Sequence, residues 1–239
     1  MTQNSLRWQG RRSGTVCLRV MLTAARSLRT DTAPIRITIA GTNNEYFVQR
    51  TLLAAASSRF LEALNPQDKS LCLRSQDSFR MFAHWLYYRR FPKTNHGDGH
   101  TDPEWTYHGV AGAQAVLVNA WNFGDEWAVP AFQNAIMRLL HRELQTQKAE
   151  LDAIAATYKG GSPDSVLRQL LVADLTSWMH EDGEATSREL FRRHGLQTMP
   201  NFMLDVTEAL RVRLRRDKDT KPQKLLRDVE QCMLPEPES

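Results

Sequence analysis

The chain has 239 residues, enough for one large domain or two small ones, and its 41% apolar and 24% charged residues are ordinary for a globular protein. The net charge of +4 belongs to the start of the chain, because residues 1–30 hold six arginines and no acid, which leaves the remainder little charge to attract nucleic acid. The three cysteines are too far apart for a disulfide framework or zinc site, and no apolar run reaches the roughly 20 residues of a membrane helix.

Residues 1–33 are rich in Arg, Ser and Thr and predict a flexible N-terminal arm or a loosely packed leading helix. Such an Arg-rich, acid-free start is also typical of a mitochondrial transit peptide, but no cleavage signal is readable. Free thiols and the absence of a secretory signal indicate a reducing compartment. We therefore expect an intracellular protein, cytoplasmic or nuclear, with mitochondrial targeting as the lesser alternative.

From Pro34 onward the pattern predicts a β-hairpin and then two short helices. Ile35, Ile37 and Ile39 alternate with polar residues, as in a half-buried strand, and a Gly-Asn turn separates them from a second strand at residues 46–48. The period then becomes helical, with two groups of apolar positions: Leu52, Leu53, Ala55 and Ala56, then Phe60, Leu61 and Leu64.

A third short strand and three longer helices are predicted next. Leu71 and Leu73 alternate again, and an amphipathic helix follows with apolar residues at i, i+3, i+4 and i+7: Phe79, Phe82, Ala83 and Leu86. Residues 92–112 form a loop longer than most connections and predict an insertion. One helix then runs through residues 116–121, and the next begins at Pro130, because proline suits the first helical turn.

Residues 148–214 predict a helical C-terminal extension. Apolar residues share one face over residues 151–158, and a second helix is expected after Ser162 as its cap and Pro163 as its first-turn proline. A third helix is expected from Pro200.

Residues 215–239 predict a charged tail, with a short helix around Leu225, Leu226 and Val229 and disorder from Pro235. A basic run leads into this tail and allows two interpretations, a charged helix end or a nucleic-acid patch on a transcriptional regulator. Its members are Arg211, Arg213, Arg215, Arg216, Lys218, Lys221 and Lys224.

The order of a hairpin, a helix pair, a strand, a helix, a loop and a second helix pair resembles the BTB/POZ domain, in particular its fungal branch. Residues 47–53, with Ser57 and Phe60 behind them, are similar to the family's F-x-V-H-K-x-L-L … S-x-F-F signature. Two positions depart from it, with Gln49 in place of the histidine and Arg50 in place of the lysine.

Three further stretches carry the resemblance. Residues 79–87 are similar to the F-x-x-F-L-x-W-L-Y helix of fungal members, and residues 120–136 are similar to the helix pair that follows it. Residues 158–172 resemble the Y … S-P-x-R-x-L-L-V stretch beyond, so the likeness covers roughly residues 34–214.

The resemblance implies an α+β fold, in which a small β-sheet is flanked by a helical cluster and residues 34–145 make the BTB/POZ domain. It implies a scaffold or adaptor that binds proteins and self-associates, with no catalytic residue, cofactor or metal. The residues that it marks as signature or core positions are Phe47, Leu52, Leu53, Ser57, Phe60, Phe79, Phe82, Trp85, Leu86 and Tyr87.

A cullin-type ubiquitin ligase is the best-known partner of this family. The family grips cullins through a hydrophobic-x-Glu element, and the corresponding residues 65–70 are short and contain no glutamate. The expectation of a protein partner therefore does not rest on cullin recruitment.

Enzyme and metal motifs are incomplete in this sequence. His180 and Glu181 begin like a zinc-protease motif, but the second histidine one helical turn later is missing. Ser162 lacks the G-x-S-x-G elbow that exposes a nucleophile. A metal could be gathered only by side chains within the Gly-rich loop, which offers no rigid frame: His96, Asp98, His100 and His108.

Overall fold

The computed structural model describes residues 34–64, 70–91, 112–160, 162, 165–182, 191–192, 195–196, 199–216 and 229–236. The chain divides into two units, Met1–Gln76 and Asp77–Ser239. This division falls within the predicted domain of residues 34–145, whose boundaries stay a prediction. The predicted arm of residues 1–33 and all but the last residue of the loop at 92–112 lie outside the described residues.

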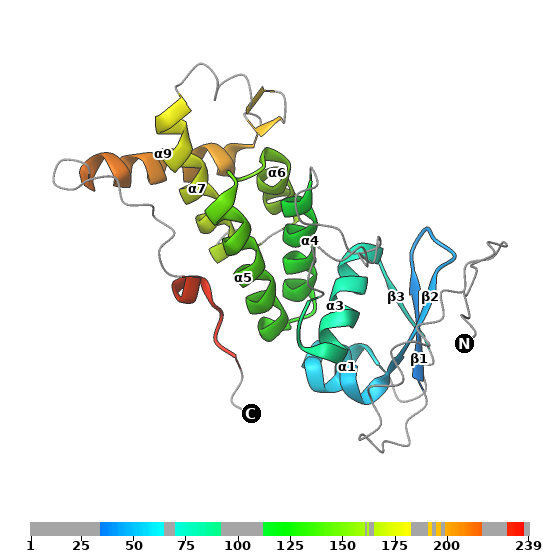
Figure 1. Cartoon of the computed structure of the whole chain (residues 1–239). Coiled ribbons are helices and arrows are strands. Elements are labelled where there is room, and N and C mark those ends of the chain that lie inside the picture. The colour runs from blue at the N-terminus through cyan, green and yellow to red at the C-terminus, as the bar shows by residue number, and fades with distance from the viewer. Residues whose placement is uncertain are drawn as a thin grey trace, which may run out of the picture. The chain divides into compact units, whose positions relative to one another are not determined.

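The first unit contains the sheet and two short helices (Figure 1). In chain order its elements are β1 (Pro34–Ile39), β2 (Glu45–Gln49), α1 (Arg50–Ala56), α2 (Ser58–Ala63) and β3 (Ser70–Leu73). The strands are ordered β2-β1-β3, with β1 antiparallel to β2 and parallel to β3. The predicted hairpin, helix pair and third strand are all present.

One face of this sheet is apolar because the side chains of a strand alternate between its two faces. Ile35 lies opposite Val48 and Ile37 opposite Tyr46, and all four are almost fully buried. The predicted turn between β1 and β2 places Gly41 at φ 77°, in the left-handed region that glycine tolerates best.

The second unit is helical in the residues described. Its elements are α3 (Gln76–Tyr88), which begins at the last residue of the first unit, then α4 (Ala113–Glu126), α5 (Pro130–Thr146), α6 (Leu151–Gly160), α7 (Val166–Asp182), α9 (Pro200–Arg216) and the short 3-10 helix η4 (Val229–Cys232). The molecule is therefore α+β, mostly helical with a small mixed sheet.

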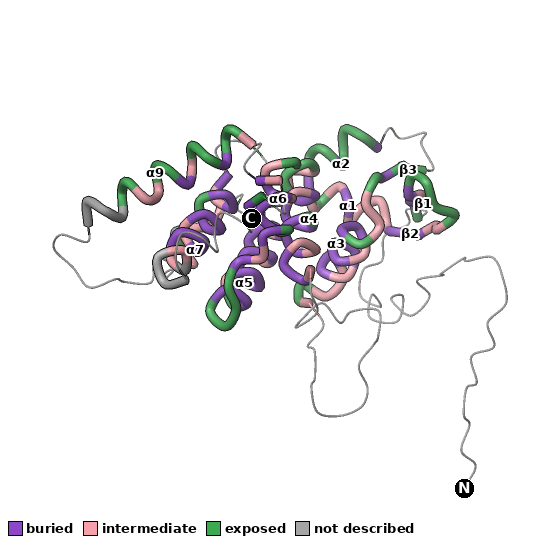
Figure 2. The backbone as a smooth tube through the Cα atoms, turned by 90° about the horizontal axis from the view of Figure 1, so that it is seen from above, coloured by how far each residue is buried: buried purple, intermediate pink, exposed green. Residues whose placement is uncertain are grey.

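Aromatic rings make the core of α3, α4 and α5. The Phe82 ring centroid lies 5.4 Å from those of both Phe123 and Phe132. The helices α4 and α5 approach closely at Gly124, where an added Cβ would stand 2.6 Å from Cγ of Gln133. Figure 2 shows this pair largely buried, whereas α2 and α9 are mostly exposed.

Two predicted helix starts had different outcomes. Pro130 is the first residue of α5, as expected. The prediction for Ser162 and Pro163 is wrong, because α7 begins at Val166 and the Oγ atom of Ser165 accepts the N–H of Leu167 at 3.1 Å. A hydroxyl two residues before a backbone N–H of the first turn is an N-cap, so Ser165 caps this helix.

A short 3-10 helix at Val229–Cys232 includes Val229 of the predicted tail helix, whereas Leu225 and Leu226 fall outside the described residues. Among the helices that the structure describes, none combines the length and apolarity needed to cross a bilayer.

Candidate interaction surfaces

Four of the five signature residues in the first unit hold its helix pair in place. Leu53 and Phe60 are completely buried, and Leu52 is half-buried. Ser57, 6% exposed, separates the two helices, and its Oγ atom accepts the N–H of Arg59 at 3.0 Å to cap α2. These positions are structural.

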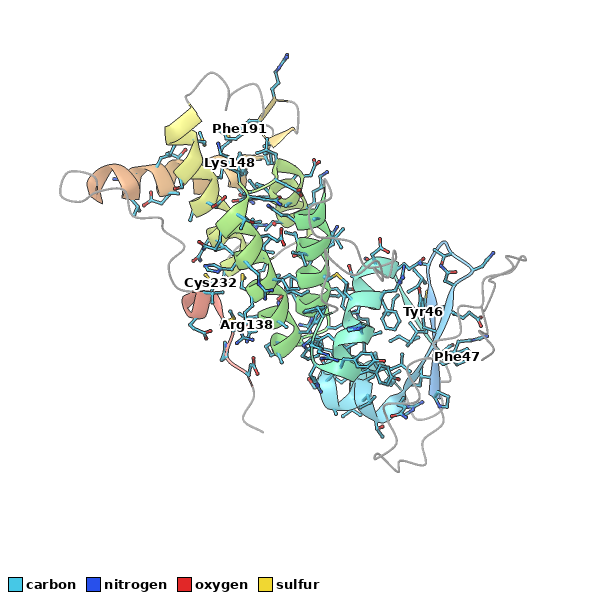
Figure 3. The ribbon with its side chains drawn as sticks, in the orientation of Figure 1. Tyr46, Phe47, Arg138, Lys148, Phe191 and Cys232 are labelled. Atoms are coloured by element: carbon cyan, nitrogen blue, oxygen red, sulfur yellow. The ribbon has the colours of Figure 1, made fainter. Side chains whose placement is uncertain are left out.

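The prediction that Phe47 is a core residue is wrong. Its side chain is 40% exposed because the neighbouring Tyr46 and Val48 occupy the inner face of β2, and alternation sends Phe47 to the outer face. Tyr46 and Phe47 lie on opposite sides of the sheet (Figure 3). An exposed aromatic residue on a sheet is a candidate contact for a partner.

Charged and polar residues surround Phe47 on this outer face. Arg36 stands directly across from Phe47 on β1, and its Nη1 atom lies 3.4 Å from Oε1 of Glu45. Both partners of this ion pair are well exposed, so it adds little to folding stability. The exposed thiol of Cys72 lies on β3 of the same sheet. We call Arg36, Glu45, Phe47 and Cys72 the outer sheet face.

The signature residues of α3 are mostly core. Phe79, Phe82, Trp85 and Leu86 are at most 4% exposed, and Tyr87 is half-buried. The Phe82 ring lies against those of Phe79 and Trp85, and the guanidinium of Arg89 lies 4.5 Å from the Trp85 ring centre.

The helical extension is closed by a polar contact that joins three helices. The Tyr158 hydroxyl of α6 donates to Oδ2 of Asp205 on α9 at 2.5 Å, and the guanidinium of Arg168 on α7 lies 4.5 Å from the Tyr158 ring centre. Partial burial, and then the hydrogen bond to Asp205, raise the pKa of Tyr158 far above its usual range, so its hydroxyl stays protonated and donates.

Carboxylate and amide side chains tie other helix ends together. Both Glu150 carboxylate oxygens accept N–H groups at the start of α4, from Gly112 and Gln114, and the Glu150 N–H donates to the Oε1 atom of Gln114 at 2.8 Å. Asp174, buried in α7, accepts the N–H of Ala149 at 2.8 Å. These contacts satisfy backbone groups near the starts of α4 and α6 that no helix can satisfy internally.

The helix α9 carries three exposed apolar residues, namely Met203, Leu204 and Val212. Arg211 stands 3.8 Å from Glu208 as an exposed ion pair. The side chains at 213–216 and all of residues 217–224 lie outside the described part, so the nucleic-acid interpretation of the basic run stays a prediction.

The other chemical candidates from the sequence also lie outside the described residues. These are the side chains of His180 and Glu181 and the loop group of His96, Asp98, His100 and His108. Within the part that the structure describes, no three His, Cys, Asp or Glu side chains gather as metal ligands.

A contact that sequence reasoning missed lies between α5 and the end of the chain. Asn134 is 2% exposed, and its carboxamide bonds both backbone polar groups of Leu234. The prediction of disorder from Pro235 is therefore wrong for Pro235 and Glu236, which follow Leu234 in the described tail. A polar residue at a buried helical position is the only sequence signal of this contact.

The sequence was also compared with models of known protein families and with curated proteins. Neither comparison gave a match.

Proposed function

We propose that this protein is an interaction module of the BTB/POZ type, which acts as a scaffold or adaptor for other proteins and self-associates. The observation that carries the proposal is the order of elements, namely the β1–β2 hairpin, the α1–α2 pair, β3 beside β1, then α3 and the α4–α5 pair. This is the order of the family that the sequence resembles. Because fold alone does not establish function, the proposal needs a test on a defined surface.

The outer sheet face supports self-association. Phe47 supplies an apolar centre, and Arg36 and Glu45 supply one charge of each sign beside it. A two-fold interface presents the same patch from both copies, so Arg36 of one copy can approach Glu45 of the other around two facing Phe47 rings. Aromatic residues at the centre of a polar rim are the usual composition of a protein interface.

Sedimentation of the full chain over a range of concentrations tests this proposal. We expect the mean mass to rise with concentration, and Phe47→Ser to weaken self-association by about tenfold or more, in the range of an interface hot spot. Leu204→Ser is the matched control, since Leu204 is even more exposed but lies on α9. A chain that stays monomeric and captures no protein partner in a pull-down contradicts the proposal.

The competing function, a nucleic-acid-associated regulator, has a different signature. Binding to DNA or RNA through residues 211–224 would weaken steeply with salt and vanish when these basic residues are neutralised. Salt-independent association with proteins, identified by affinity purification and mass spectrometry, is the result that we expect instead.

A further inference from the structure

The end of the described chain, residues 229–236, lies against the helices of the second unit. We call these residues the tail segment. Its first turn, η4, packs on both α5 and α7 (Figure 1). Beyond η4 the tail segment has no regular secondary structure, so its backbone polar groups need partners outside the segment.

Asn134 supplies those partners for one residue of the tail segment, Leu234. Its Oδ1 atom accepts the N–H of Leu234 at 2.7 Å, and its Nδ2 atom donates to the carbonyl oxygen of Leu234 at 2.9 Å. The same Nδ2 atom donates to Oε1 of Glu236 at 2.9 Å. The carboxamide therefore uses one acceptor and two donor contacts on a single short segment.

This geometry recognises a peptide by its backbone. The residue before a proline is pushed towards extended conformations, so Pro235 favours an extended Leu234. In an extended residue the N–H and the carbonyl point to the same side of the chain, which is the arrangement that a carboxamide can match with two hydrogen bonds. The contact requires an extended backbone and does not require leucine itself.

Side chains add a second level of selectivity. Met233 and Leu234 are half-buried, whereas Pro235 and Glu236 are exposed apart from the carboxylate contact. Arg138 lies one helical turn beyond Asn134 and extends from α5 on the side where the tail segment runs (Figure 3). The site thus suits an aliphatic residue followed by proline and an acidic residue.

We propose that this Asn134 site on α5 and α7 is a binding site for an extended aliphatic–Pro–acidic segment of a partner protein, and that the tail segment occupies the site until the partner displaces it. Because the tail segment is tethered, it competes at an effective concentration that for short linkers is on the order of millimolar. A free partner segment therefore binds the intact chain weakly. This proposal does not depend on the function of the first unit.

Fluorescence anisotropy of the full chain with a fluorescein-labelled peptide of residues 229–236 tests the proposal. The double variant Leu234→Pro, Glu236→Lys releases the tail segment, because it removes the N–H that donates to Asn134 and reverses the charge beside Nδ2. We expect it to bind the peptide at least tenfold more tightly than the wild-type chain. Adding Asn134→Ala to this variant should abolish the gain.

A second peptide controls for the possibility that a protein variant fails to fold. The same peptide with proline at the Leu234 position should not bind the released variant, because it cannot donate to Asn134. Equal binding of both peptides, or no gain for the released variant over wild type, overturns the proposal. Phe47→Ser should leave peptide binding unchanged, so failure of self-association and failure of the Asn134 site are distinguishable.

Discussion

In the unit that ends at Gln76, alternation along short strands makes the core, whereas in the unit that begins at Asp77 buried polar side chains close the joints between helices. The sheet of the first unit turns Ile35, Ile37 and Val48 inward and leaves charged residues outside. In the second unit, Asn134 and Asp174 are at most 5% exposed, and each bonds to backbone groups of a distant segment.

The two units therefore have different weak points. An apolar core loses stability in proportion to the volume removed, and the loss depends little on which atom is missing. A buried polar contact depends on one acceptor or donor, and its removal leaves the other group without a partner. Substitutions in the apolar core should therefore cause the larger losses of stability. At a buried polar position, two replacements of nearly the same shape should differ in stability when only one of them keeps the hydrogen bond.

The largest effect is expected from Phe132→Ala. Phe132 is completely buried, and its ring centroid lies 5.4 Å from those of Phe82 and Trp85. The lost burial and the cavity should reduce the free energy of unfolding by about 3–5 kcal/mol, measured by urea unfolding with circular dichroism. Phe60→Ala makes the same change in the first unit. If both variants unfold in a single transition and lose the same free energy of unfolding, the contrast between the two units is broken.

Asp174→Ala should come next, with a loss of about 1–3 kcal/mol in the free energy of unfolding, because the N–H of Ala149 loses its acceptor. Asp174→Asn is the control, since its amide oxygen still accepts this hydrogen bond. Urea unfolding of the two variants compares them directly. Equal losses would show that the charge of Asp174, and not its hydrogen bond, stabilises this joint.

Tyr158→Phe should reduce the free energy of unfolding by about 1 kcal/mol at neutral pH, because the hydrogen bond to Asp205 is lost. The pKa of Tyr158 is raised in the folded chain, so as pH rises above about 10 the unfolded state loses this proton while the folded state keeps it. The wild-type chain should therefore lose stability above pH 10.

Unfolding measured from pH 8 to pH 11 checks this pH dependence. The stability of the Tyr158→Phe variant should fall less steeply, so the difference between the two proteins narrows as pH rises. Parallel curves for wild type and variant would contradict a raised pKa at this position.

The smallest effect on folding is expected from Phe47→Ser. Phe47 is 40% exposed on the outer sheet face, so the free energy of unfolding at low protein concentration should change by about 0.5 kcal/mol or less. Thermal unfolding followed by circular dichroism measures this change. A loss comparable with that of Phe60→Ala would place Phe47 in the core after all.

Much of the architecture could be predicted because it follows from local rules. The alternation of Ile35, Ile37 and Ile39 indicates a strand in any fold, and the change of period after Thr51 indicates helices. Pro130 marks a helix start because its ring sets the backbone angle of the first turn. These signals need only neighbouring residues, and the structure has the corresponding elements.

Where several apolar residues follow one another in a strand, it was harder to predict which of them face the core and which face outward. Tyr46, Phe47 and Val48 are all suitable for a core, and only the pairing of β2 with β1 decides that Phe47 is the one left outside. Ser162 and Ser165 are both suitable caps, and the structure selects Ser165.

Local patterns in the chain predict most of its strands and helices, because backbone preferences and apolar periods act over a few residues. The tertiary structure alone decided which polar groups meet, because these contacts join residues far apart in the chain. Tyr158 and Asp205 are 47 positions apart, and Asn134 and Leu234 are 100 positions apart. No local pattern encodes such a pair, since each partner is chosen by how the helices between them pack.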